Sequence, residues 1–154
     1  MLKYESTLIT FTEVPDEISL CINLTCCPCR CEECFEPWLR KDYGSILTFD
    51  AITQMRLQNP HISCICFMGG DNDHMALYQL CKMIKSYYPN LKLAFYSGLT
   101  SMDSQLAEYL DYYKFGPYMP EFGPLNKETT NQVFLQKQGS QWHNITYRFQ
   151  TKKG

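Results

Sequence analysis

Cysteine is concentrated in one short stretch of the chain, and thiolates at close spacing are ligands for zinc and for iron–sulfur clusters. The chain has nine cysteines. Most of them stand in the segment Cys26-Cys27-Pro28-Cys29-Arg30-Cys31-Glu32-Glu33-Cys34, with Cys21 shortly before it. An odd number of cysteines, packed this closely, does not suit a disulfide framework spread over a small secreted fold. The pattern favours metal or cluster ligation in a reducing compartment.

The spacing of these cysteines allows two kinds of site. Cys26-x2-Cys29 and Cys31-x2-Cys34 resemble two zinc knuckles, but only one residue separates the pairs, and zinc sites normally place a longer excursion there. The set Cys27-x3-Cys31-x2-Cys34 instead supplies three thiolates from one loop. Three thiolates can anchor three irons of a [4Fe-4S] cluster and leave the fourth iron open to a substrate. The cluster is favoured, zinc stays an alternative, and Cys26 and Cys29 are either surrogate ligands or bystanders.

Two further polar features follow predicted strands. Gly69-Gly70-Asp71 comes directly after the apolar run 62–68, and Ser97-Gly98 follows the alternating segment 91–95. The cysteines themselves follow a strand predicted over 18–24. Because the carboxyl ends of parallel strands meet at one edge of a sheet, where such sheets bind ligands, we expect all three features there. The alternative for the two glycines is a simple tight turn.

Hydrophobic periodicity predicts the elements that position these residues. A strand over 8–14 precedes the strand over 18–24 and starts the fold in antiparallel fashion. Helices are predicted after Thr48, ending at Asn59-Pro60, after Asp73 or Asn72, ending at Pro89, and over 102–110, capped near Thr100 or Ser101. A strand over 112–115 and a hairpin of 133–137 with 145–149 complete the chain. Repeated βα units predict an α/β fold with mainly parallel strands.

Composition limits the function classes. With 154 residues, 45% of them hydrophobic and 19% charged, the chain suits one globular domain over 1–154 and not a disordered protein. The formal net charge is -2 and no basic stripe appears, so we expect no nucleic-acid partner. Neither an export signal nor an apolar run of about 18 residues is visible, so we expect no membrane association and a cytoplasmic location.

The other cysteines and the histidines are expected to have structural rather than chemical roles. Cys21, Cys64, Cys66 and Cys81 stand on apolar elements, where core packing is the expected role of cysteine. The three histidines lie apart in loops or near element ends, and we expect ordinary surface histidines rather than ligands; they are His61, His74 and His143.

The triad Cys27-x3-Cys31-x2-Cys34, joined to Gly69-Gly70-Asp71 after a buried strand, resembles the radical S-adenosylmethionine superfamily. Within it, the chain is most similar to the activating proteins of anaerobic (class III) ribonucleoside-triphosphate reductase. Further landmarks of that family follow in order and are listed here: Phe35, Trp38, Tyr96-Ser97-Gly98, Lys114-Phe115-Gly116 and Thr129-Thr130-Asn131-Gln132. The chain departs from the family in lacking Gly-Pro-Gly before the first strand, in Glu33 where Gly is common, and in Asn72 where Pro is common.

The resemblance implies a [4Fe-4S] cluster whose open iron is chelated by S-adenosylmethionine. Reductive cleavage of S-adenosylmethionine gives a 5'-deoxyadenosyl radical that takes hydrogen from a glycine of the partner reductase. The implied cluster ligands are Cys27, Cys31 and Cys34, and the implied S-adenosylmethionine contacts are Glu33, Cys34, Phe35, Gly69, Gly70, Asp71, Ser97 and Gly98. The glycines would let the backbone approach the methionine moiety, and Asp71 would accept from its ammonium group.

The resemblance also implies a fold and partners. The chain is too short for a full radical barrel with an added substrate domain, so we expect an incomplete, open-sided βα barrel with a C-terminal β-hairpin. An open side suits a protein substrate, here the anaerobic reductase, and an electron donor such as flavodoxin or ferredoxin is implied. The alternatives are another small radical S-adenosylmethionine enzyme, acting on a different glycyl-radical protein or a small molecule, and a zinc-stabilised interaction module.

Overall fold

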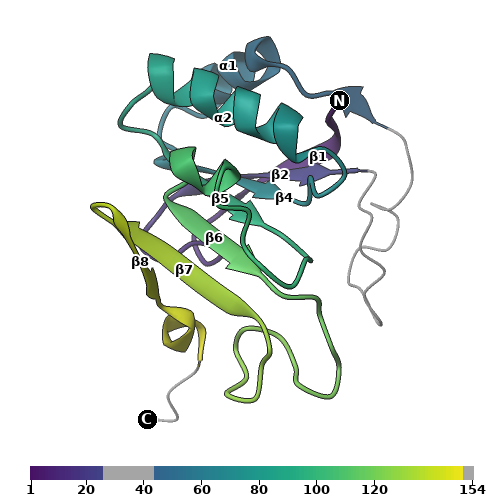
Figure 1. Cartoon of the computed structure of the whole chain (residues 1–154). Helices are drawn as coiled ribbons and strands as arrows, with labels where there is room; N and C mark the ends of the chain where they lie inside the picture. The colour runs from purple at the N-terminus through teal and green to yellow at the C-terminus, as the bar shows by residue number, and fades with distance from the viewer. Residues whose placement is uncertain (26–43, 151–154) are drawn as a thin grey trace.

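The structure is a computed structural model that describes residues 1–25 and 44–150 (Figure 1). The strands are β1 (Lys3–Thr10), β2 (Ser19–Leu24), β3 (Ser45–Ile46), β4 (Cys64–Met68), β5 (Lys92–Tyr96), β6 (Tyr112–Phe115), β7 (Val133–Gln138) and β8 (Gln141–Asn144). The helices are α1 (Phe49–Gln58) and α2 (His74–Tyr87), with short 3-10 turns η2 (Leu106–Tyr109) and η3 (Thr146–Phe149). The alternation of strands and helices confirms the predicted α/β class.

All eight strands form one sheet in the order β3-β1-β2-β4-β5-β6-β7-β8. The central pairings β2–β4, β4–β5 and β5–β6 are parallel. The outer pairings are antiparallel: β1–β2, β1–β3, β6–β7 and β7–β8. The predicted antiparallel start and C-terminal hairpin are confirmed, but the expectation of mainly parallel strands is wrong, because only three of the seven pairings follow crossover connections. Among the described strands β3 and β8 are edges, so the sheet is open.

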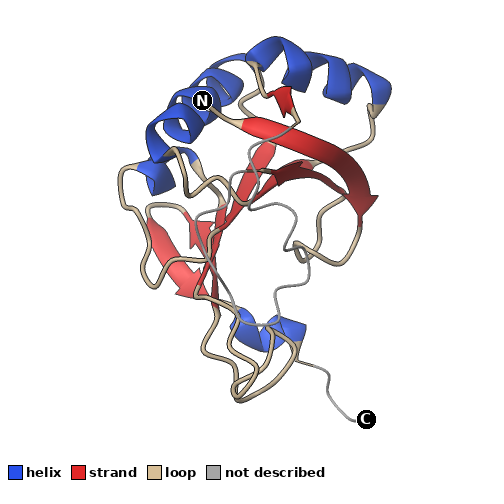
Figure 2. Ribbon diagram, turned by 90° about the vertical axis from the view of Figure 1, so that its right-hand side faces the viewer, coloured by secondary structure: helices blue, strands red, loops and turns tan. Residues whose placement is uncertain are grey.

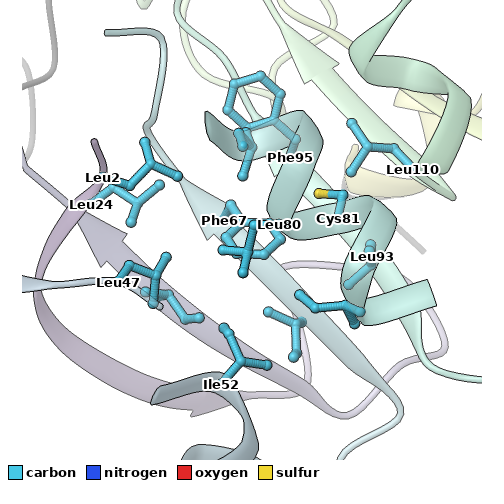
Figure 3. Close-up of a cluster of buried hydrophobic side chains, with 14 of the residues drawn as sticks. Leu2, Leu24, Leu47, Ile52, Phe67, Leu80, Cys81, Leu93, Phe95 and Leu110 are labelled. Atoms are coloured by element: carbon cyan, nitrogen blue, oxygen red, sulfur yellow. The ribbon is translucent and has the colours of Figure 1, made fainter. Parts of the chain in front are cut away.

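Both α-helices cover one face of this sheet (Figures 1 and 2). Alternate strand residues point to that face and build the main core, in which Ile65 and Phe67 are fully buried against α2. Figure 3 shows side chains of the strands and helices meeting there; those labelled include Leu24, Ile52, Phe67, Leu80, Cys81, Leu93 and Phe95. Each such buried side chain contributes about 1.5–3 kcal/mol through removal of apolar surface from water.

The opposite face carries a second, smaller cluster. Its buried members are Val14, Cys21, Cys64, Cys66, Ala94, Tyr112, Phe134 and Ile145. Segments outside the central strands cover it, through Val14, Leu125 and Phe149. Cys21, Cys64, Cys66 and Cys81 are buried, which confirms their predicted packing role. Burial raises the pKa of the Cys66 thiol well above its ordinary value, so this group stays protonated and apolar in character.

The two main helices begin at the predicted caps. Thr48 Oγ1 accepts the N–H of Ala51 at 3.1 Å, and Asp73 Oδ1 accepts the N–H of Ala76 at 3.0 Å. Asn59 is the C-cap residue of α1 and Tyr88 that of α2, so both helices end before a proline, as expected for Pro60 and Pro89. In the part of the chain that the structure describes, no helix has the length and apolar character needed to span a bilayer.

Two predicted elements, the first strand and the third helix, differ from the structure in extent or type. The first strand is β1 over 3–10 rather than 8–14, because Glu13 to Asp16 turn back and Asp16 takes a positive φ of 67°. The helix expected over 102–110 shrinks to η2, because Asp103 Oδ1 accepts the N–H groups of Gln105 and Leu106 and delays helix entry. Neither Thr100 nor Ser101 caps it.

The hairpin uses a different second strand from the one expected. β8 covers 141–144 and pairs with β7 across the two-residue turn Gly139-Ser140, where Gly139 has a φ of 64°. The segment predicted as a strand, 145–149, contains η3 instead. Asn144 Oδ1 accepts both the N–H and the hydroxyl of Thr146, at 3.0 and 2.6 Å, and turns the chain out of the sheet.

An ion pair ties α2 to the amino ends of β5 and β6. Lys85 Nζ lies 2.6 Å from Asp111 Oδ2, and the same oxygen accepts the N–H of Leu93 at 2.9 Å. We predict that Asp111→Asn lowers the free energy of unfolding by about 1–3 kcal/mol, since it leaves a partly buried cation with a weaker acceptor. The exposed neighbour Glu108 gives the control, with a change below about 0.5 kcal/mol for Glu108→Gln in urea titrations. Equal effects of the two substitutions would contradict the assignment.

Candidate functional site

The four central strands end at one edge of the sheet, which we call the carboxyl edge. Asn23, Met68, Tyr96 and Lys114 are successive neighbours in register across β2, β4, β5 and β6. The loops that follow these strands therefore leave the sheet side by side. This alignment confirms the expectation that Gly69-Gly70-Asp71 and Ser97-Gly98 lie at a shared edge.

The predicted cluster ligands Cys27, Cys31 and Cys34 lie outside the described residues, as do the predicted contacts Glu33 and Phe35. The flanks of their segment are described. Leu24 and Ser45 both pair with Tyr4 of β1, so the chain leaves β2 and returns to β3 at neighbouring points of the carboxyl edge.

Both flanks are fixed by the backbone. The N–H of Thr25 donates to Lys3 O at 2.9 Å. At Gly44 the φ is 102°, and an added Cβ would lie 2.3 Å from Tyr4 O, so only glycine fits. The two described flanks of the cysteine-bearing segment therefore lie at the edge that carries Gly69-Gly70-Asp71 and Ser97-Gly98.

Gly69 and Gly70 form a turn directly after β4. Their φ angles are 96° and 114°, which favour glycine, and the N–H of Gly69 donates to Tyr96 O at 3.1 Å. A Cβ on Gly70 would lie 2.9 Å from Leu24 Cδ1. The turn therefore packs against the last side chain of β2. The tight-turn interpretation accounts for both glycines.

Asp71 joins this turn to the end of β5. Its side chain is fully buried, at 0% exposure. Asp71 Oδ1 accepts the hydroxyl of Ser97 at 2.7 Å, and Oδ2 accepts the N–H of Gly98 at 2.9 Å. Charge-assisted hydrogen bonds of this kind compensate the cost of burying a carboxylate. The structure thus brings together Gly70, Asp71, Ser97 and Gly98, four residues predicted to share one site.

His74 belongs to the same cluster, and the expectation of an ordinary surface histidine is wrong for it. Its Nε2 lies 2.8 Å from Asp71 Oδ1, and its Nδ1 lies 2.9 Å from Asp103 Oδ2. The ring also meets Phe95 edge-on, with centroids 5.6 Å apart. His61 and His143 are exposed, as expected. The spacing of His74, three residues after Asp71 at a helix start, was the signal available in the sequence.

The pKa of His74 is set by opposing effects. Burial lowers this pKa, but hydrogen bonds and charge attraction from Asp71 and Asp103 raise it, and the net shift is upward. Only the imidazolium form donates from both ring nitrogens, which is the form that two carboxylate partners favour. The two carboxylates therefore favour the imidazolium form of His74, which bridges them.

Lys114 brings a second cation to the carboxyl edge. The side chain is buried, and Nζ donates to Gly116 O at 3.1 Å and to Ser97 O at 3.4 Å. It also lies 5.8 Å from the centroid of the Tyr96 ring. This residue belongs to the landmark 114–116, and it ties the ends of β5 and β6 together beneath the Ser97-Gly98 loop.

The landmark 129–132 shapes the loop that follows β6. Thr129 Oγ1 donates to Phe122 O at 2.7 Å, and Thr130 Oγ1 donates to Gly123 O at 3.0 Å. Asn131 Nδ2 donates to Pro117 O at 2.9 Å. These side chains satisfy backbone carbonyls of the loop and so stabilise its conformation.

The contrast between Gly70 and Gly139 gives a test of the turn at the site. Gly70→Ala combines an unfavourable φ with overlap against Leu24, so we predict a loss of about 2–4 kcal/mol in the free energy of unfolding. At Gly139 an added Cβ meets nothing within 4 Å, so Gly139→Ala carries only the backbone cost, about 1 kcal/mol. Denaturant unfolding measures both, and equal losses would show that Leu24 does not confine the turn.

Comparison with known proteins adds one family. The profile of the 4Fe-4S single cluster domain family matches residues 18–144. This range runs from β2 through β8 and includes the cysteine segment and the carboxyl edge. No curated protein and no solved structure matches the chain. Of the two ligation chemistries that the cysteines left open, the family supports the iron–sulfur cluster, and the chain belongs to the 4Fe-4S single cluster domain family.

Proposed function

We propose that this protein is an activating enzyme that uses a [4Fe-4S] cluster and S-adenosylmethionine to install a glycyl radical on anaerobic ribonucleoside-triphosphate reductase. The observation that carries the proposal is the composition of the carboxyl edge. There the flanks of the cysteine segment adjoin Gly69-Gly70-Asp71 and Ser97-Gly98. The family match to a 4Fe-4S single cluster domain supports the cluster half of the proposal.

The residues present fit the proposed cofactors. Cys27, Cys31 and Cys34 offer three soft thiolate ligands, one fewer than a four-iron cluster needs, which leaves an iron for a chelating ligand. When bound, the reduced cluster and S-adenosylmethionine supply electron transfer to the sulfonium and a 5'-deoxyadenosyl radical that takes hydrogen from glycine. Gly69 and Gly70 carry no side chain that would separate such a ligand from the backbone of their turn.

The chain's own groups bind, orient and exclude water. In the proposed site Glu33 and Phe35 line the ligand beside the cysteines, and Gly69, Gly70 and Gly98 offer backbone groups. Ser97 is 1% exposed, so its hydroxyl orients Asp71 away from solvent. Lys114 adds positive charge beside the backbone carbonyl of Ser97, which favours an anionic group of the ligand at the same edge.

A protein substrate fits the shape of the sheet. Its strand order ends at β3 and β8 without closing, so one side of the proposed partial barrel is open. Two exposed apolar side chains stand on loops of the carboxyl edge, Leu99 after β5 and Phe122 after β6. Apolar surface beside a reactive site suits contact with another protein. The proposed partners are the anaerobic reductase and, in the cytoplasm, an electron donor such as flavodoxin or ferredoxin.

A second candidate uses the same site on a different substrate. The matching family is described by its single cluster alone, which suits any small radical S-adenosylmethionine enzyme, including an activase for another glycyl-radical protein. The two candidates share every contact described above and differ in the macromolecule that reaches the open side.

Anaerobic reconstitution tests the cluster. We predict about four irons per chain after addition of iron and sulfide, and loss of the cluster in Cys31→Ala, because one thiolate fewer leaves two irons without protein ligands. Cys81→Ala is the control, since Cys81 is buried in the main core on α2. Iron analysis, absorption and circular dichroism provide the measurements. One tightly bound zinc and no cluster in the wild type would refute the assignment.

Radical transfer tests the substrate. Mixing the reduced, cluster-loaded protein with S-adenosylmethionine and the anaerobic reductase should give an electron resonance signal of a glycine-centred radical on the reductase. Replacing that reductase glycine by alanine should remove the signal. An intact cluster that cleaves S-adenosylmethionine but produces no glycyl radical would favour the second candidate.

A further inference from the structure

We propose that His74 and Asp103 are positioning residues of this site. They orient Asp71 so that its carboxylate clamps the turn 69–71 to the loop 97–98. In this role Asp71 does not serve as the acceptor of a ligand ammonium group. The structure connects these residues in one chain of hydrogen bonds, Asp103–His74–Asp71–Ser97. The part of the inference that concerns the ligand rests on the proposed function. The part that concerns the network stands on the contacts alone.

The first support is the use that the protein makes of the Asp71 carboxylate. Oδ1 faces both the Ser97 hydroxyl and His74 Nε2, and Oδ2 accepts the N–H of Gly98. A carboxylate has about four acceptor positions, and at least three are occupied by groups of this chain. Because the side chain is fully buried, these bonds define its orientation. An ammonium group would compete with donors that already hold the loop.

The second support is the way that the far end of the network is anchored. Asp103 Oδ1 accepts the N–H groups of Gln105 and Leu106, while its Oδ2 faces His74. The N–H of Asp103 donates to Tyr113 Oη at 2.9 Å. The carboxylate behind His74 is therefore fixed to η2 and β6. His74 is hydrogen-bonded to this carboxylate and to Asp71, so it connects η2 and β6 to the turn after β4.

The third support is the charge balance around the imidazole. Asp71 and Asp103 face the two ring nitrogens, Tyr113 lies beside both carboxylates, and Phe95 covers the ring. Asp73, on the same turn, is paired with the amino terminus of Met1. The positive end of α2 opposes an imidazolium at its first residue. The two carboxylates outweigh that effect, because the pKa of His74 is raised.

The consequence concerns the backbone that a ligand would meet. Loss of the His74 bridge frees Asp71, and the turn 69–71 is then no longer tied to the loop 97–98. Both segments offer peptide groups to the proposed site. The clamp therefore affects every ligand that uses these peptide groups, whether or not the ligand carries an ammonium group.

The sign of the pH effect follows from the raised pKa of His74. The imidazolium bridge contributes its full stability below the ordinary pKa of the unfolded chain, about 6.5, and loses it as the pH rises through the higher folded value. Stability and ligand affinity should therefore both fall as the pH rises through this window. A variant without the imidazole lacks this dependence.

The network is tested first without any ligand. In the full chain with its diamagnetic oxidised cluster, we predict an NMR titration of His74 above 6.5 that Asp103→Asn moves downward. The control variant is Glu108→Gln at an exposed position, which should leave the His74 titration unchanged. A pKa of His74 at or below 6.5, or one that Asp103→Asn leaves unchanged, would overturn the bridge.

The positioning role is tested by affinity for two ligands, S-adenosylmethionine and its analogue without the amino group. We predict that Asp71→Asn and His74→Gln weaken both ligands by the same factor, about tenfold for the loss of one charge-assisted bond. His143→Gln should change neither affinity. The wild-type affinity should fall with rising pH through the His74 titration, and that of His74→Gln should not.

The outcomes separate the two proposals. A loss confined to S-adenosylmethionine, with the analogue unaffected, would show direct contact between Asp71 and the ammonium group and overturn the positioning role. Failure of the wild type to bind either ligand would contradict the proposed function, and the positioning role would fall with it, while the titration still decides the network. If Asp71→Asn does not fold, the affinities of His74→Gln for the two ligands are sufficient for the comparison.

Discussion

The common register of the four parallel strands is the constraint on which the site depends. Asn23, Met68, Tyr96 and Lys114 stand side by side, so every loop that carries a candidate residue leaves the sheet at the same edge. Side-chain period in a strand is two, and a slip of one residue in β4 would move its core face to the other side. The apolar packing of Ile65 and Phe67 under α2 therefore also fixes where the turn at Gly69 begins.

Burial of the Asp71 carboxylate is a second constraint on the site, and it is electrostatic. A buried charge requires donors, and the protein supplies them from two other segments, the Ser97-Gly98 loop and the first turn of α2. The same bonds join loops that the sheet only places near one another. Placement by strand register and fixation by a charged network are thus separate contributions, and a change in the second can alter the site without disturbing the sheet.

Local signals predicted most of the scaffold and part of the site. The apolar period of 18–24, the caps Thr48 and Asp73, and the glycines after β4 each follow from short-range chemistry. The failures arise where tertiary contacts decide: Asp103 and Asn144 use their side chains to redirect the backbone, which shortens one helix and ends one strand. The role of His74 depends on a carboxylate 29 residues away, a contact that periodicity does not reveal.

The proposed function requires an iron at the carboxyl edge that lacks a protein ligand and is chelated by S-adenosylmethionine. Electron–nuclear double resonance of the reduced, cluster-loaded protein measures this directly, with S-adenosylmethionine labelled by 15N in its amino group and 17O in its carboxylate. We predict couplings of both nuclei to the cluster spin, as expected for bonds to one iron. A cluster signal that shows no coupling to either label, in the presence of bound ligand, would contradict the account.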